Sequence, residues 1–143
     1  MSAKIESVLV LGLGKVGSLV GTLLQGSGFR VTGADLLDRP DLPFPIEKMD
    51  LRQPGELRKK LKEFEAVVSC LPYYCNLGVA SAAHALGVHY FDLTEDVPTT
   101  KEILKMSRTA KGVLAPQCGL APGFIAITGA TLAEKFSRIR SIK

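Results

Sequence analysis

The sequence predicts an α/β fold built on a doubly wound parallel sheet of six strands in the order 3-2-1-4-5-6. Short aliphatic runs alternate with helical patterns along all 143 residues, the rhythm of repeated βαβ units. The clearest run, residues 8–11, is apolar at every position, as expected of a strand buried on both faces. A glycine-rich turn then separates this strand from the first helical pattern. Right-handed crossovers between such units produce a doubly wound sheet.

The first half of the chain carries three expected strands and two expected helices. The first helix has its leucines and a valine on one face, and Gly26 and Gly28 end it. The second strand ends at Asp35 and a weaker third strand ends at Asp50. Pro54 suits the first turn of the charged, amphipathic helix that follows. In chain order these elements are strand 8–11, helix 18–25, strand 29–34, strand 44–49 and helix 55–64.

The second half repeats the pattern with three further strands. A helix rich in small residues closes at Gly87, since glycine readily ends helices. Thr99 and Glu102 have the spacing of a capping box, which predicts that the next helix opens at Thr99. In chain order these elements are strand 66–70, helix 76–86, strand 88–91, the helix opened by Thr99, strand 112–115 and a helix from about residue 123 to 136.

Composition and charge predict one cytoplasmic domain without a nucleic-acid or membrane partner. Lys and Arg number 18 against 14 Asp and Glu, a net charge of +4. The basic residues are scattered among acidic ones, apart from the last few, and form no basic–aromatic stripe. No apolar stretch approaches the roughly 18 residues of a membrane span. Three cysteines without a C-x-x-C pair fit reduced thiols.

Residue spacing gives no sign of a metal site or of a catalytic group. His84 and His89 have no partner at metal-ligand spacing. Cys70 follows the fourth strand with no adjacent base, so we expect a small buried hydrophobe rather than a nucleophile. Cys118 has the same expectation. The sequence therefore predicts no metal and leaves the catalytic residues unknown.

The strongest motif is Gly12-Leu13-Gly14-Lys15-Val16-Gly17, a G-x-G-x-x-G string between an expected strand and an expected helix. In that context it is the dinucleotide fingerprint of a Rossmann-type domain. Gly12 permits the tight turn, Gly14 lets a pyrophosphate approach the backbone, and Gly17 lets the helix pack on the strand. The amides at the helix start, at Lys15 and Val16, then face the anion. The alternative is a glycine-rich turn that binds nothing.

An acidic residue at the end of the second strand supports this interpretation. Asp35 lies 18 positions after Gly17, where a carboxylate accepts hydrogen bonds from the adenosine ribose hydroxyls. It would repel a 2′-phosphate, so NAD is favoured. Arg39 lies close enough in sequence to receive that phosphate, so NADP remains an alternative. Asp50 is a candidate adenine contact, or equally a cap for the segment that follows it.

The loop after the fourth strand supplies the remaining candidate binding residues. The first and fourth strands flank the switch point of this topology, so their carboxyl ends form the crevice for the cofactor. Leu71 and Pro72 lie in that loop, and Pro72 would stiffen it beside the nicotinamide ribose. Tyr73 and Tyr74 either face the substrate or cover the loop.

These segments together resemble a known family. Residues 10–17, 69–73, 90–94 and 119–123 are similar to the N-terminal NAD(P)-binding domain of the saccharopine dehydrogenase family. The resemblance implies that residues 69–73 and 92–94 lie beside the cofactor. It also implies that residues 119–123 lead into a helix joining a separate substrate domain. Saccharopine reductases carry Asp where this chain has Ala121, which points instead to a lysine dehydrogenase-like branch.

The resemblance also implies a function and a domain division. Residues 1–136 would form the NAD(P)-binding domain, and residues 137–143 the start of a missing substrate domain or a linker. The full enzyme would move a hydride between nicotinamide and the amine-bearing carbon of an amine or amino acid, and a homodimer is compatible with it. The fragment alone would be inactive, its catalytic residues lying elsewhere. The alternatives are a ligand-sensing Rossmann domain of the potassium-transport type and a protein-interaction module without ligand.

Overall fold

The computed structural model describes residues 5–37, 39, 41–50 and 53–141. Its strands are β1 (Ser7–Leu11), β2 (Arg30–Asp35), β3 (Ile46–Lys48), β4 (Ala66–Ser69), β5 (His89–Asp92) and β6 (Leu114–Ala115). Its helices are α1 (Lys15–Gly26), α2 (Pro54–Leu61), α3 (Tyr73–Leu86), α4 (Val97–Ser107) and α5 (Ile125–Ala133), the last preceded by an irregular helical segment, Leu120–Phe124.

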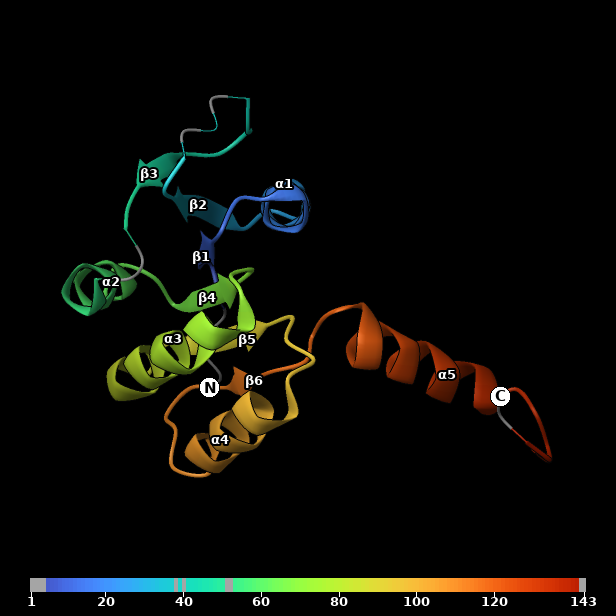
Figure 1. The fold of residues 1–143 in the computed structure, drawn as a ribbon. Helices are drawn as coiled ribbons and strands as arrows, with labels where there is room; N and C mark the ends of the chain where they lie inside the picture. Colours follow the sequence, from blue (N-terminus) through green and yellow to red (C-terminus); the bar gives the residue numbers. More distant parts are fainter. Residues whose placement is uncertain (1–4, 38, 40, 51–52, 142–143) are drawn as a thin grey trace.

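The strands form one parallel sheet in the order β3-β2-β1-β4-β5-β6 (Figure 1). This confirms the predicted fold class and strand order. The chain reverses its direction of winding between β1 and β4, so the carboxyl ends of these two central strands open a crevice.

Two apolar cores lie on the two faces of the sheet. One core joins side chains of α2, α3 and α4, such as Leu61, Val79 and Ile103, to inward residues of the central strands. The other joins β1 and β2 to Phe44, with Leu24 of α1 partly buried against it. Figure 1 shows α1 alone on one side of the sheet, with α2, α3 and α4 together on the other. Both cores hold the central strand ends in place, which positions the crevice.

The helix starts differ from the sequence prediction. The capping box at Thr99 is wrong, because α4 begins at Val97 and Asp96 is its N-cap. The Asp96 carboxylate accepts a hydrogen bond of 2.9 Å from the Thr99 N–H, so Thr99 serves as a donor inside the first turn. Pro98 suits this earlier start, since proline needs no amide acceptor in a first turn. Helices α1 and α3 each begin three residues before the predicted position.

Helix α5 stands apart from the rest of the molecule. It follows β6 and the irregular segment, and Figure 1 shows it leading away from the sheet. None of its residues is buried, and neither core includes one of them. Within the described part of the chain, no helix is both long and apolar enough to cross a membrane.

Candidate dinucleotide-binding site

The turn after β1 requires glycine at its first position. Gly12 has φ of +82°, a backbone conformation that side chains disfavour. A Cβ there would also lie 3.0 Å from the Leu71 side chain and 3.1 Å from the Cys70 carbonyl. The Gly12 N–H donates to the Ala34 carbonyl at 2.9 Å. Gly12 therefore lies where the ends of β1, β2 and β4 meet.

The other two glycines of the motif have opposite surroundings. A Cβ on Gly17 would lie only 1.8 Å from the Gly12 carbonyl oxygen, so this glycine allows α1 to pack directly on the turn. A Cβ on Gly14 would meet no atom within 4 Å, and Gly14 is exposed. The backbone at Gly14 is therefore open to an approaching group, as an anion-binding corner requires.

The amino end of α1 carries uncompensated positive character. Gly14 is its N-cap, no side chain caps it, and its first turn contains no acidic residue. Because the first amides of a helix have no intrahelical acceptor, the N–H groups of Lys15, Val16 and Gly17 are available to an anion. The side chain of Lys15 is also exposed at this end. The corner thus combines an open backbone with positive charge.

The carboxylate of Asp35 lies against this corner. Its Oδ2 accepts a hydrogen bond of 2.5 Å from the Leu13 N–H, and its Oδ1 accepts one of 2.9 Å from the Leu37 N–H. These two bonds hold the carboxylate between the glycine turn and the loop after β2, while the side chain stays half-buried. Each carboxylate oxygen can accept a further hydrogen bond from a ligand.

A cavity adjoins the corner on the side of β4 and β5. Its volume is about 360 Å³, and its lining comes from α1, from the loop after β4 and from the loop after β5. Leu71 lines it, as a binding role requires, and Pro72 is the N-cap of α3 beside it. Thr94 also lines it; residue spacing gave no sign of this residue, and only the family resemblance, through residues 92–94, pointed to it. The lining residues are Val16, Cys70, Leu71, Tyr73, Leu93, Thr94, Glu95 and Asp96.

Two further candidates lie away from the cavity. Asp50 follows β3, which is separated from β1 by β2, and its carbonyl accepts a hydrogen bond of 3.0 Å from the Gln53 N–H. Its contact with adenine stays a prediction. Arg39, in the loop after β2, has a buried Nε without a hydrogen-bond partner among the described residues.

The thiol at the end of β4 is poorly suited to nucleophilic chemistry. Burial raises the pKa of Cys70 to about 11, so little thiolate exists near neutral pH. In the described ranges no group of three or more His, Cys, Asp or Glu side chains is placed to hold a metal ion.

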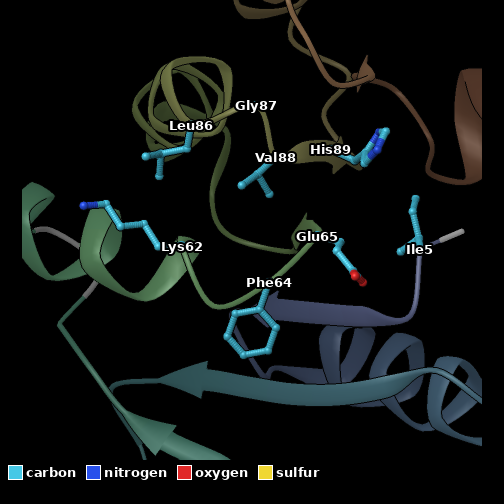
Figure 2. Close-up of a pocket in the computed structure, with 8 residues that line it drawn as sticks. All are labelled: Ile5, Lys62, Phe64, Glu65, Leu86, Gly87, Val88 and His89. Atoms are coloured by element: carbon cyan, nitrogen blue, oxygen red, sulfur yellow. The ribbon is translucent and has the colours of Figure 1, made fainter. Parts of the chain in front are cut away.

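A second cavity of about 360 Å³ lies at the opposite end of the sheet (Figure 2). Glu65, Val88 and His89 line it at the amino ends of β4 and β5. The Glu65 carboxylate is already hydrogen-bonded within the protein, because its Oε2 accepts from the Glu6 N–H, the Ser7 N–H and the Ser7 hydroxyl at 2.7 to 2.9 Å. Ligands of open α/β sheets bind at the carboxyl ends, so this cavity is not the dinucleotide site.

Solved structures share the fold at low identity. The chain is similar to apo saccharopine dehydrogenase (L-Glu forming) from Saccharomyces cerevisiae, with a TM-score of 0.79 and 22% identity over 91% of this chain and 31% of that one. The TrkA-N domain of the Escherichia coli inner membrane protein ybaL has a TM-score of 0.64 and 16% identity, over 91% of this chain and 98% of that one. An NADPH-dependent glyoxylate/hydroxypyruvate reductase from Sinorhizobium meliloti, in complex with NADP and malonate, has a TM-score of 0.57 and 16% identity, over 80% of this chain and 36% of that one. The chain thus spans about a third of the length of the yeast enzyme.

The family is shown by a separate comparison. A family model described as Saccharopine dehydrogenase NADP binding domain matches residues 8–115. That range runs from β1 to β6 and includes the glycine corner, Asp35 and the loops that line the cavity. The resemblance inferred from the sequence is therefore confirmed, and with it the assignment to a nucleotide-binding oxidoreductase family. The chain belongs to the saccharopine dehydrogenase NADP binding domain family.

Proposed function

We propose that this chain is the cofactor-binding part of an NAD(P)-dependent dehydrogenase acting on an amine or amino acid. The observation that carries the proposal is the glycine corner: an open backbone at Gly14 faces an uncapped helix end beside the fixed carboxylate of Asp35. A diphosphate carries the charge that suits the helix end. The ribose next to it carries the hydroxyl donors that suit the carboxylate.

Different residues contact different parts of the cofactor. Gly14 and the amides of Lys15 and Val16 bind the pyrophosphate, while Gly12 and Gly17 shape the turn that presents these amides. Asp35 accepts the adenosine ribose hydroxyls, and Asp50 lies on the adenine side. Leu71 and Pro72 border the cavity that receives the nicotinamide end. When bound, the nicotinamide ring gives or takes the hydride, and this domain orients it.

We favour NAD over NADP because of the charge at the end of β2. Two backbone N–H groups hold the Asp35 carboxylate at the corner, where it would repel a 2′-phosphate. Arg39 opposes this preference, since its guanidinium would attract the phosphate. The carboxylate has fixed contacts to the corner, whereas the Arg39 Nε has no hydrogen-bond partner among the described residues to orient it. NADP remains the alternative cofactor.

The substrate and the catalytic groups are proposed from the family. A lysine dehydrogenase-like branch fits Ala121 better than saccharopine itself does. The acid or base would then lie in a substrate domain beyond this chain, residues 1–136 forming the cofactor domain and 137–143 the link. The proposed setting is the cytoplasm, with a homodimer as one assembly. The chain's coverage of about a third of the yeast enzyme supports this division.

A ligand-sensing domain of the potassium-transport type is the second candidate. The TrkA-N domain has nearly the same length as the matched part of this chain, but a likeness at 16% identity supports the fold alone. The family match over residues 8–115 favours the dehydrogenase.

Calorimetric titration with NAD, NADH, NADP and NADPH tests the proposal. The wild type is expected to bind NAD(H) more tightly than NADP(H). Asp35→Asn should narrow that preference, because it removes the negative charge and keeps an oxygen acceptor for the backbone, and Asp35→Ala should weaken NAD(H) binding. Asp41→Asn, an exposed residue of the following loop, is the matched control. Equal binding of all four dinucleotides, or of none, contradicts the proposal. Oxidation of lysine-like amines by this chain alone would contradict the placement of the catalytic groups outside it.

A further inference from the structure

A chain of polar side chains is buried behind the cavity. The Ser69 hydroxyl donates to Asn76 Oδ1 at 2.7 Å, and the Tyr90 hydroxyl donates to Asp92 Oδ2 at 2.7 Å. The Tyr90 oxygen also lies 3.4 Å from the Asn76 carbonyl oxygen. All four side chains are almost fully buried. They line up behind the carboxyl ends of β4 and β5, the two strands that border the cavity.

The Asp92 carboxylate joins two loops that are distant in sequence. Its Oδ1 accepts hydrogen bonds from the Thr94 N–H at 2.9 Å and from the Gln117 N–H at 3.0 Å. The Asp92 carbonyl accepts a third, from the Cys118 N–H at 2.8 Å. Gln117 has φ of +64°, a costly conformation for a residue other than glycine. The bond to Asp92 holds it there, so Asp92 fixes the loop after β5 and the loop after β6 together.

Burying a carboxylate is costly unless donors surround it. An apolar residue at the end of β5 would fill the core without that cost but could not bind either loop. Thr94, which Asp92 holds by its backbone, lines the cavity, and its hydroxyl accepts a hydrogen bond of 3.1 Å from the Asp96 N–H. Asp96 in turn caps α4. The hydrogen bonds thus run from Asp92 to Thr94, and from Thr94 to Asp96, along the β5 side of the cavity wall.

We infer that Asp92, held by Tyr90, is a positioning residue for the nicotinamide end of the cofactor. It acts through Thr94, which forms the cavity wall, and through the segment 116–118, from which the chain leaves toward α5. The inference rests on the proposed function, because it assumes a dinucleotide at the glycine corner. It assigns to Asp92 an effect on one end of that ligand: the adenosine diphosphate end contacts the corner and Asp35, which Asp92 does not touch.

Asp92→Asn distinguishes binding of the nicotinamide end of the ligand from binding of its adenosine diphosphate end. The amide keeps an oxygen for the two backbone N–H groups, but it loses the charge and turns an NH₂ group toward the Tyr90 hydroxyl. Affinity for the dinucleotide that the wild type binds best should fall about tenfold, the size expected for weakening charge-assisted hydrogen bonds. Affinity for ADP, which lacks the second ribose and the nicotinamide, should stay within about twofold. Tyr90→Phe, which removes only the hydroxyl donor to Asp92, should lower the dinucleotide affinity to a smaller degree and leave the ADP affinity unchanged.

Glu65→Gln is the matched control. Glu65 is also a carboxylate with three donors, two of them backbone N–H groups, but it lies at the opposite end of the sheet (Figure 2). It should leave the ratio of the two affinities unchanged. In ¹⁵N-edited NMR spectra, Asp92→Asn should shift the Thr94 and Gln117 amide signals, and Glu65→Gln should leave both in place.

The outcomes are distinguishable. A loss confined to the dinucleotide supports the positioning role. An equal loss for ADP, or no loss for the dinucleotide in a folded Asp92→Asn protein, overturns it; if that variant does not fold, the same criteria apply to Tyr90→Phe. If the wild type binds ADP but no dinucleotide, the inference fails while an adenosine site stands. If it binds neither, the proposed function itself fails.

Discussion

Replacing Gly14 and Gly17 separately by alanine distinguishes the binding role of the glycine motif from its structural role. In Gly17→Ala the new Cβ would start 1.8 Å from the Gly12 carbonyl oxygen, against an ordinary contact of at least 3.4 Å. Helix α1 would have to move by about 1.6 Å, and Cys70, whose Cβ lies 3.2 Å from the same position, limits that movement. Overpacking costs about 1–3 kcal/mol, and a clash with backbone belongs at the upper end. We expect a loss of about 3 kcal/mol in the free energy of unfolding, or roughly 10 °C in Tm.

Gly14→Ala should leave the fold almost unchanged. The backbone there, with φ of −67° and ψ of −168°, is accessible to alanine, and its Cβ meets no atom within 4 Å. Alanine is a poorer N-cap than glycine by roughly 0.5–1 kcal/mol, and it restricts the unfolded chain by about 0.4–1 kcal/mol. These two effects offset, so the free energy of unfolding should change by less than about 0.5 kcal/mol. The methyl group would nevertheless stand where the diphosphate approaches the backbone, and dinucleotide affinity should fall at least about tenfold.

Urea unfolding and calorimetric titration of both variants measure the two quantities separately. Gly14→Ala with wild-type dinucleotide affinity would show that the ligand does not approach this corner. Gly17→Ala with wild-type stability would show that α1 does not pack on the turn as the structure has it. Either result refutes the division of roles.

Two further predictions concern titratable groups. The pKa of Asp96 is lowered by hydrogen bonds from the Thr99 hydroxyl and amide, so its capping stabilises the fold above the unfolded-state pKa, and this stabilisation is lost as pH falls through the folded-state pKa. In thermal scans, Asp96→Ala should lower Tm near neutral pH but not in acid, whereas Glu102→Ala should leave Tm unchanged. A larger loss in Glu102→Ala than in Asp96→Ala would restore the capping box at Thr99. Burial raises the pKa of Cys70 to about 11, and burial together with Asp92 raises the pKa of the exposed Cys118. Thiol labelling followed by mass spectrometry should therefore modify both thiols slowly at neutral pH, and the half-buried Cys70 more slowly than Cys118; faster labelling of Cys70 would contradict this order.

The sheet and the glycine corner could be predicted from the sequence because both depend on local signals. Continuous apolar runs mark strands that are buried on both faces, and the glycine motif has meaning through its place between a strand and a helix. Asp35 follows from the end of the second strand. These features gave the strand order and placed the acidic residue at the corner.

The helix starts could not be predicted in the same way. Apolar periodicity identifies only the turns that face a core. The first turns of α1 and α3 face the crevice, and there Lys15, Val16, Tyr73 and Tyr74 are exposed. A helix whose first turn faces the crevice is therefore predicted three residues too short when it is judged by its apolar side chains. The turns that the sequence pattern missed are the ones that face the crevice.

The buried polar chain could not be predicted because its partners are far apart in sequence. Asp92 and Gln117 meet only when β5 and β6 pair, and His89-Tyr90-Phe91-Asp92 resembles an ordinary apolar strand with a polar end. Single-sequence patterns report neighbours along an element, not contacts between loops. The carboxylate that organises the cavity wall is visible only in the folded molecule.

The hydrogen bonds of Asp92 matter for the position of α5, because neither apolar core includes a residue of this helix. The packing that holds the glycine corner therefore does not orient α5. Among the described residues, the segment leading to α5 is held to the cavity wall by the hydrogen bonds that Asp92 accepts from Gln117 and Cys118. Hydride transfer requires the nicotinamide face and the substrate to be held within about 0.5 Å of their productive arrangement. If the proposed function holds and a substrate domain follows α5, Asp92 would connect the position of that domain to the position of the nicotinamide, whereas Gly14 and Asp35 would determine only that the cofactor binds.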